Sequence, residues 1–185
     1  MTWLCGAAAT CAANPQCGFR QPETLDFAFL NQPQRAKYYR AFAPDSLSRA
    51  ELADTAEQHL RRAAENALWQ PESWHTAPVF VASSAYLISE YENRRLSGEP
   101  PPENHLLHLS DDLLRRSGNR SIFNTATACT SAAHALMQAH RFLSRGLAER
   151  AFVLGIENLN RLTLLHFHSL GLFADEYRPF GGNGL

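Results

Sequence analysis

The chain has 185 residues, of which 45% are hydrophobic and 19% are charged, and its formal net charge is -1. This length fits one domain, and the balanced charge argues against a general nucleic-acid binder, which carries a basic surplus. No apolar run reaches the ~18 residues of a membrane span, so we expect no membrane partner. No basic residue precedes the apolar N-terminal stretch, so we expect no signal peptide and a cytoplasmic protein.

The four cysteines, Cys5, Cys11, Cys17 and Cys129, form no C-x-x-C pair. A chain of this size does not need disulfide bonds to fold. We therefore expect reduced cysteines, with Cys5, Cys11 and Cys17 as packing or loop residues.

The N-terminal part predicts one short strand and one long helix. Residues 3–10 indicate a buried strand of small residues, in which Gly6 permits the close approach of a neighbour. Residues 12–37 are rich in Asn, Pro, Gln and Gly, and we expect an irregular excursion there. Ser48 begins a helix with the capping-box pattern Ser-Arg-Ala-Glu, and Pro71 stops it. We expect this helix to lie on a sheet with its charged side chains solvated.

The middle of the chain predicts a strand and then two helices on either side of a loop. We expect a buried strand over residues 78–82, followed by a helix that Ser83 or Ser84 caps and that runs to Leu96. Residues 97–104 indicate a loop. A second helix is expected over residues 111–117, with Ser110 as its cap and Gly118 after it. The loop lies within one alternation of strands and helices, so we expect it to connect parts of one domain.

Residues 121–125 predict a strand that leads into an alanine-rich helix over residues 130–145, which Gly146 ends. Apolar residues cover most of the helix circumference at its start and narrow to a stripe later, and a helix that is small and apolar nearly all round is typically buried. Residues 151–156 predict another strand, so the stretch forms a βαβ unit. The alternation along the chain indicates an α/β fold with a mostly parallel sheet covered by helices.

Cys129 stands where the predicted strand turns into the buried helix. Ligands of open α/β sheets gather at the carboxyl ends of the strands, which is where this turn lies. The unpaired N–H groups and partial positive charge of a helix N-terminus favour a thiolate over a thiol. Cys129 is therefore a candidate nucleophile, and the alternative is a small apolar cysteine buried in the core.

The eight histidines raise the question of a metal site or of a base for the cysteine. The pairs at positions 134 and 140 and at positions 166 and 168 lack the i, i+4 spacing that places two ligands on one helix face, so we expect no metal and no other cofactor. A thiol nucleophile needs a base or an electric field. His134 is expected on a different side of the helix from Cys129, and His166 or His168 would approach only through the fold.

The C-terminal part predicts a helix over residues 159–173 and a loop over residues 175–185. The loop contains Gly181, Gly182 and Gly184. It is a weak candidate for a phosphate site, because it lacks the Lys-Ser/Thr of a phosphate loop and follows no strand.

Several motifs occur together in an order and spacing typical of one enzyme family. They are Thr127-Ala128-Cys129-Thr130-Ser131-Ala132, the alanine-rich helix with Gly146 after it, Leu154-Gly155-Ile156-Glu157, and Arg178-Pro179-Phe180. In these motifs the chain resembles the N-terminal half of the β-ketoacyl-acyl-carrier-protein synthases, the condensing enzymes of fatty acid and polyketide synthesis, which have the thiolase-like fold. The resemblance is strong over residues 123–180 and fainter over residues 48–82.

The resemblance implies that Cys129 is the family's nucleophile and accepts an acyl group as a thioester from an acyl carrier protein or coenzyme A. A carbanion from a decarboxylating malonyl thioester would then attack that acyl group, and the N–H of Cys129 would be one oxyanion-hole donor. The resemblance also implies a homodimer, or a heterodimer with a ketosynthase.

Members of this family are longer, and their second half carries the histidines and the lysine that promote decarboxylation. We therefore expect residues 1–185 to form a single β-ketoacyl synthase N-terminal-type domain, a thiolase-like half-domain that is incomplete at its C-terminal end. The leading hypothesis is a β-ketoacyl synthase or its N-terminal portion, an acyltransferase that does not complete condensation as an isolated chain. The alternatives are a truncated, non-condensing subunit that binds acyl chains or a partner ketosynthase, and a cysteine acyltransferase or thioesterase that uses one of its own histidines.

Overall fold

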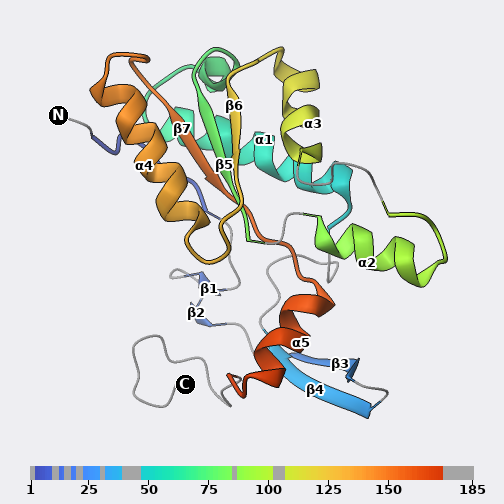
Figure 1. Ribbon diagram of the computed structural model, residues 1–185. Helices are drawn as coiled ribbons and strands as arrows, with labels where there is room; N and C mark the ends of the chain where they lie inside the picture. Colours follow the sequence, from blue (N-terminus) through green and yellow to red (C-terminus); the bar gives the residue numbers. More distant parts are fainter. Residues whose placement is uncertain are drawn as a thin grey trace. The chain divides into compact units, whose positions relative to one another are not determined.

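The computed structural model describes residues 3–9, 13–14, 18–19, 23–29, 32–38, 47–84, 87–101 and 107–172 (Figure 1). The chain falls into two compact units, of which the first comprises Met1–Ala9 and Leu47–Asn158 and the second comprises Thr10–Ser46 and Leu159–Leu185. The described residues hold five α-helices and a small parallel sheet, which confirms the predicted α/β class. The expectation of one domain that is incomplete at its C-terminal end stays a prediction.

A three-stranded parallel sheet forms the centre of the first unit, with the strand order β6-β5-β7. The strands are β5 over Val79–Ala82, β6 over Ile122–Thr125 and β7 over Phe152–Gly155. All four residues of β5 are buried, as the apolar run over residues 78–82 predicts. Ala82, Thr125 and Gly155 stand side by side in the register, so the carboxyl ends of the three strands meet at one edge of the sheet.

Helix α1 spans Arg49–Asn66 and begins as the sequence predicts. The hydroxyl of Ser48 accepts a hydrogen bond from the N–H of Glu51 (3.4 Å), and the Glu51 carboxylate accepts one from the N–H of Ser48 (2.8 Å). These two bonds confirm the predicted capping box. The helix ends before Pro71, which opens the 3₁₀ helix η1, Pro71–His75.

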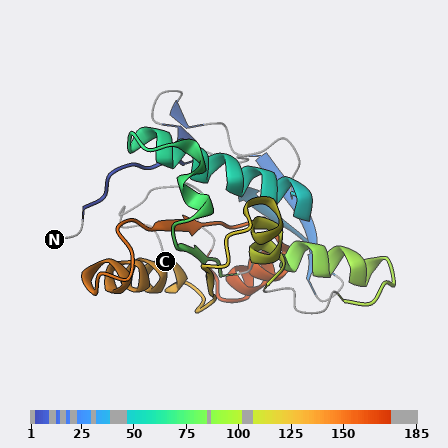
Figure 2. The same cartoon turned by 90° about the horizontal axis from the view of Figure 1, so that it is seen from above.

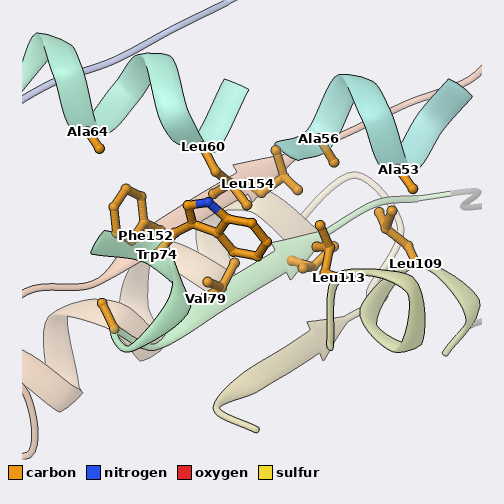
Figure 3. Packing of buried hydrophobic residues seen from close by; sticks show 12 residues of the cluster. Ala53, Ala56, Leu60, Ala64, Trp74, Val79, Leu109, Leu113, Phe152 and Leu154 are labelled. Atoms are coloured by element: carbon orange, nitrogen blue, oxygen red, sulfur yellow. The ribbon is translucent and has the colours of Figure 1, made fainter. Parts of the chain in front are cut away.

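One face of the sheet packs against α1 and α3, and α4 covers the opposite face (Figure 2). On the first face, Val79 of β5 lies in one apolar cluster with Leu60 of α1 and Leu113 of α3 (Figure 3). Val81 of β5 belongs to the same cluster. Trp74 of η1 joins this cluster and is fully buried. Burying a valine or leucine side chain contributes about 1.5–3 kcal/mol, so the cluster fixes both helices on the sheet.

Helix α4 spans Ser131–Ser144, and Ala135 and Ala139 pack it against the second face of the sheet. Phe142 also packs against this face, but the outward side of α4 is open, since Leu136 is 57% exposed and Met137 is 40% exposed. The prediction of a nucleophile helix buried nearly all round is therefore wrong. Alanine is favourable anywhere in a helix, so an alanine-rich composition does not by itself indicate burial.

Two helices start at positions other than the predicted ones. Helix α2, Ile88–Leu96, has no side-chain cap, and Ser84 instead donates from its N–H and its hydroxyl to Glu157 (2.5 and 2.8 Å). Ser110, predicted as a cap, lies inside α3, His108–Ser117. Gly118 follows α3, as predicted, and it ends the helix in the left-handed conformation.

The predictions for the N-terminal part are wrong in two places. Residues 3–9 contain no strand, and Trp3 is 72% exposed. Gly6 does permit a close approach, because a Cβ there would lie 2.5 Å from the carbonyl oxygen of Ala63 in α1. The described part of residues 12–37 is not irregular but holds antiparallel pairs. These are β1, Ala13–Asn14, with β2, Gly18–Phe19, and β3, Glu23–Phe29, with β4, Gln32–Tyr38.

Helix α5, Arg161–Ser169, lies in the second unit and confirms the helix expected within residues 159–173. Asn160 caps it by accepting a hydrogen bond from the N–H of Thr163 (2.8 Å). The loop expected over residues 175–185 lies outside the described residues, as does the Arg178-Pro179-Phe180 motif. Among the helices of the described part, none has the length and apolar character needed to cross a bilayer.

A bidentate ion pair joins α1 to α3, so this part of the α1 surface is not simply solvated. The guanidinium of Arg49 donates to both carboxylate oxygens of Asp112, at 2.6 and 3.0 Å. Partial burial alone would raise the pKa of Asp112, but the hydrogen bonds and charges of Arg49 and Arg115 together outweigh it and hold that pKa below its usual value. Arg115 also donates to Asp112.

The capping box predicts a measurable cost for Ser48→Ala. The substitution removes the acceptor for the N–H of Glu51 and should lower the free energy of unfolding by about 1 kcal/mol. Urea unfolding followed by circular dichroism measures the change. Ser97→Ala, at the C-cap of α2, is the matched control, and an equal loss in both variants would contradict the prediction.

The ion pair predicts acid-dependent stability. Because the pKa of Asp112 is lowered in the folded state, its contribution is present above the unfolded value of about 3.9 and is lost as the pH falls through the folded value. Asp112→Asn should therefore lower the free energy of unfolding by about 1–2 kcal/mol at neutral pH and much less in acid. Urea unfolding at several pH values measures this, with Glu65→Gln on α1 as the control. A deficit that does not change with pH would show that the charge of Asp112 is not the cause.

Candidate functional site

Cys129 lies in the turn between β6 and α4, at the carboxyl edge of the parallel sheet. Its thiol is free and exposed. Helix α4 begins at Ser131 with Thr130 as its N-cap, so Cys129 directly precedes the cap. The predicted position at a strand-to-helix turn is confirmed, and the alternative of a cysteine buried in the core is wrong.

The residue before Cys129 has an unusual backbone conformation. Ala128 has a φ of +53°, in the left-handed region. A residue with a Cβ pays about 1–2 kcal/mol there, and such a conformation persists only where the surroundings fix it. The turn that presents Cys129 is therefore strained and must be stabilised by its neighbours.

Ser131 provides that stabilisation from the first turn of α4. Its side chain is buried, and its hydroxyl accepts a hydrogen bond from the N–H of Thr127 (2.8 Å). The same hydroxyl lies within donor distance of the carbonyl oxygens of Ala128 (2.6 Å) and Ser83 (3.1 Å), and its single proton serves one of them at a time. Ser131 thus ties the turn to the end of β5.

His134 reaches the same turn through Thr127. Its Nδ1 lies 3.0 Å from the hydroxyl oxygen of Thr127, and its side chain is half-buried. The Thr130 hydroxyl lies 2.7 Å from the carbonyl oxygen of Thr127 and 3.1 Å from its hydroxyl oxygen. Thr127 therefore has both its backbone and its side chain bonded to the start of α4.

The carboxyl edge of the sheet brings together residues that follow three different strands. Ser84 follows β5, Cys129 follows β6 and Glu157 follows β7. Ser84 and Glu157 are hydrogen-bonded to each other across this edge. The sequence pattern pointed to Cys129 and not to this pair, although Ser84 and Glu157 each stand two positions after the end of a strand, which was a usable signal.

Asn158 fixes the chain immediately after Glu157. Its side-chain oxygen accepts from the N–H of Leu47 (3.0 Å), and its amide donates to the carbonyl of Leu47 and to the hydroxyl of Ser89 (both 2.8 Å). Leu47, Ser89 and Asn158 are all buried, so loss of the Asn158 side chain would remove hydrogen bonds from buried polar groups, which is costly. The β7 end of the edge is therefore rigidly anchored.

Within the described ranges, no group of three His, Cys, Asp or Glu side chains could hold a metal ion. The expectation of no cofactor stays a prediction. His166 and His168 lie on α5 in the second unit. Gly181, Gly182 and Gly184 lie outside the described residues.

The chain matches no protein-family model and no curated protein. Fold and site together define a coarse class: an α/β protein with an exposed cysteine at the carboxyl edge of a parallel sheet. The resemblance to the β-ketoacyl-acyl-carrier-protein synthases stays a prediction from the sequence motifs.

The left-handed backbone at Ala128 predicts a gain in stability for Ala128→Gly. Glycine has no Cβ penalty there, but it loses more entropy on folding, so the net gain should be about 0.5–1 kcal/mol. Leu68→Gly is the matched control, because Leu68 also has a positive φ, 58°, and is 94% exposed.

Both glycine variants should be more stable in urea unfolding, but only Ala128→Gly should slow the alkylation of Cys129 by iodoacetamide, because it loosens the turn that positions the thiol. Peptide mass spectrometry measures that rate. A loss of stability in Ala128→Gly would show that Ala128 is not strained.

Proposed function

We propose that this chain is a β-ketoacyl synthase, or its N-terminal portion, with the thiolase-like fold. Cys129 accepts an acyl group from an acyl carrier protein or coenzyme A thioester for decarboxylative condensation with a malonyl thioester. The observation that carries the proposal is the exposed Cys129 thiol in a strained turn between β6 and α4. Strained backbone of this kind clusters at functional sites, which supports a chemical role for the turn.

The loading step requires a nucleophile and a place for developing negative charge. A bond forms between Cys129 Sγ and the acyl carbon, the bond between that carbon and the carrier's sulfur breaks, and the proton of the Cys129 thiol ends on the carrier thiol. The N-terminus of α4, which carries the partial positive charge of a helix end, lies next to Cys129. The N–H of Cys129 is the proposed oxyanion donor.

These 185 residues carry out acyl loading, and condensation also requires the residues of a complete synthase that promote decarboxylation. In the resembling family, that enzyme is a homodimer or a ketosynthase heterodimer whose histidines and lysine promote decarboxylation. We place the protein in the cytoplasm, where its thiols stay reduced.

A second candidate is a non-condensing subunit that binds acyl chains or a partner ketosynthase. The outward side of α4 favours it, because Leu136 and Met137 are large, apolar and exposed on the helix that follows the cysteine. Exposed apolar surface of this kind is typical of a protein or ligand interface. In this reading the acyl group on Cys129 is held and not condensed.

Cys129→Ser tests the nucleophile directly. After incubation with an acyl-carrier thioester, the wild-type protein should gain the acyl mass on the peptide that contains Cys129, and Cys129→Ser should gain none. Cys5→Ser is the matched control, because Cys5 is also a free, exposed thiol. The proposal fails if Cys129 gains no acyl group while iodoacetamide labels Cys5.

Malonyl thioester separates the two candidates. When it is added to the acylated protein, loss of the acyl group from Cys129 with formation of a β-ketoacyl thioester supports the synthase. An acyl group that persists supports the non-condensing subunit.

A further inference from the structure

We infer that His134 is a positioning residue for Cys129, acting through the side chain of Thr127. The inference rests on the proposed function for its catalytic consequence, but the contacts that carry it belong to the turn itself. His134 lies on the first turns of α4, and its Nδ1 is 3.0 Å from the hydroxyl oxygen of Thr127.

The hydrogen bonds of Thr127 attach the strained turn to helix α4. The N–H of Thr127 donates to the buried Ser131 hydroxyl, and its side chain bonds His134, so α4 holds Thr127 from both sides. Ala128, with its positive φ, and then Cys129 follow directly in the chain. Since Ala128 adopts this conformation only under constraint, the position of the thiol depends on both attachments of Thr127.

The number of hydroxyl protons determines which groups donate and which accept in these hydrogen bonds. Thr130 has one hydroxyl proton, and the carbonyl of Thr127 is its closer acceptor (2.7 Å). The hydroxyl of Thr127 is then free to donate to His134, which accepts when its ring proton is on Nε2. His134 therefore fixes the rotation of the Thr127 side chain.

His140 is the natural comparison, because it lies on the same helix at the far end from the turn. Its ring lies near the hydroxyl of Ser144, with Nε2 at 3.3 Å. An effect of α4 stability on the thiol would show in both histidines. A positioning effect would show in His134 alone.

The experiment measures the rate at which iodoacetamide alkylates Cys129, followed by peptide mass spectrometry on the full chain. His134→Ala should lower the rate about fivefold, because this factor corresponds to the loss of one hydrogen bond of about 1 kcal/mol. His134→Asn should restore it to within about twofold, because its amide can replace Nδ1. His140→Ala should leave the rate unchanged.

Thr127→Val should lower the rate as much as His134→Ala, and the double variant should be no slower than either, because both remove one bond. Thr127→Ser keeps the hydroxyl and should alkylate like the wild type. If His134→Ala does not fold, the comparison of Thr127→Val with Thr127→Ser decides the matter.

The inference is overturned if His134→Ala alkylates at the wild-type rate, if His134→Asn is as slow as His134→Ala, or if Thr127→Val and Thr127→Ser behave alike. Alkylation needs no acyl donor, so these outcomes are independent of acyl loading. A wild-type protein that accepts no acyl group refutes the proposed function and leaves the alkylation result to decide the role of His134.

Discussion

The burial of strand β5 on both faces is the constraint on which the first unit depends. Val79 and Val81 lie in the cluster with α1 and α3, while Phe80 and Ala82 lie in the cluster with α4. Because β5 is also the central strand, β6 and β7 pair with it in aligned registers. The turns that follow the three strands therefore meet at one edge, and the exposed Cys129 lies there as a result of packing elsewhere.

Features of the fold with a local cause were predictable from the sequence. Helix α1 begins at Ser48 because a serine and a glutamate satisfy each other's backbone donors, and α3 ends at Gly118 because glycine accepts a positive φ. The β3–β4 pair was missed, although alternating Leu25, Phe27 and Phe29 carry a strand signal, because the surrounding composition suggested a loop.

In the candidate site, too, features with a local cause could be predicted from the sequence and contacts between distant segments could not. The position of Cys129 between a strand and a helix could be predicted, because both elements have local signals. The contacts of Ser131 with Ser83, and of Ser84 with Glu157, could not, because they join segments brought together only by the sheet register. The open side of α4 was also missed, since sequence shows which residues could be buried but not what covers them.

The bond between Ser84 and Glu157 has an electrostatic consequence for whatever approaches this edge. One oxygen of the Glu157 carboxylate receives both the N–H and the hydroxyl of Ser84. These dipoles lower the negative potential that a bare carboxylate would project from the sheet edge. An anionic molecule would therefore meet less repulsion at this edge than an unpaired carboxylate would produce.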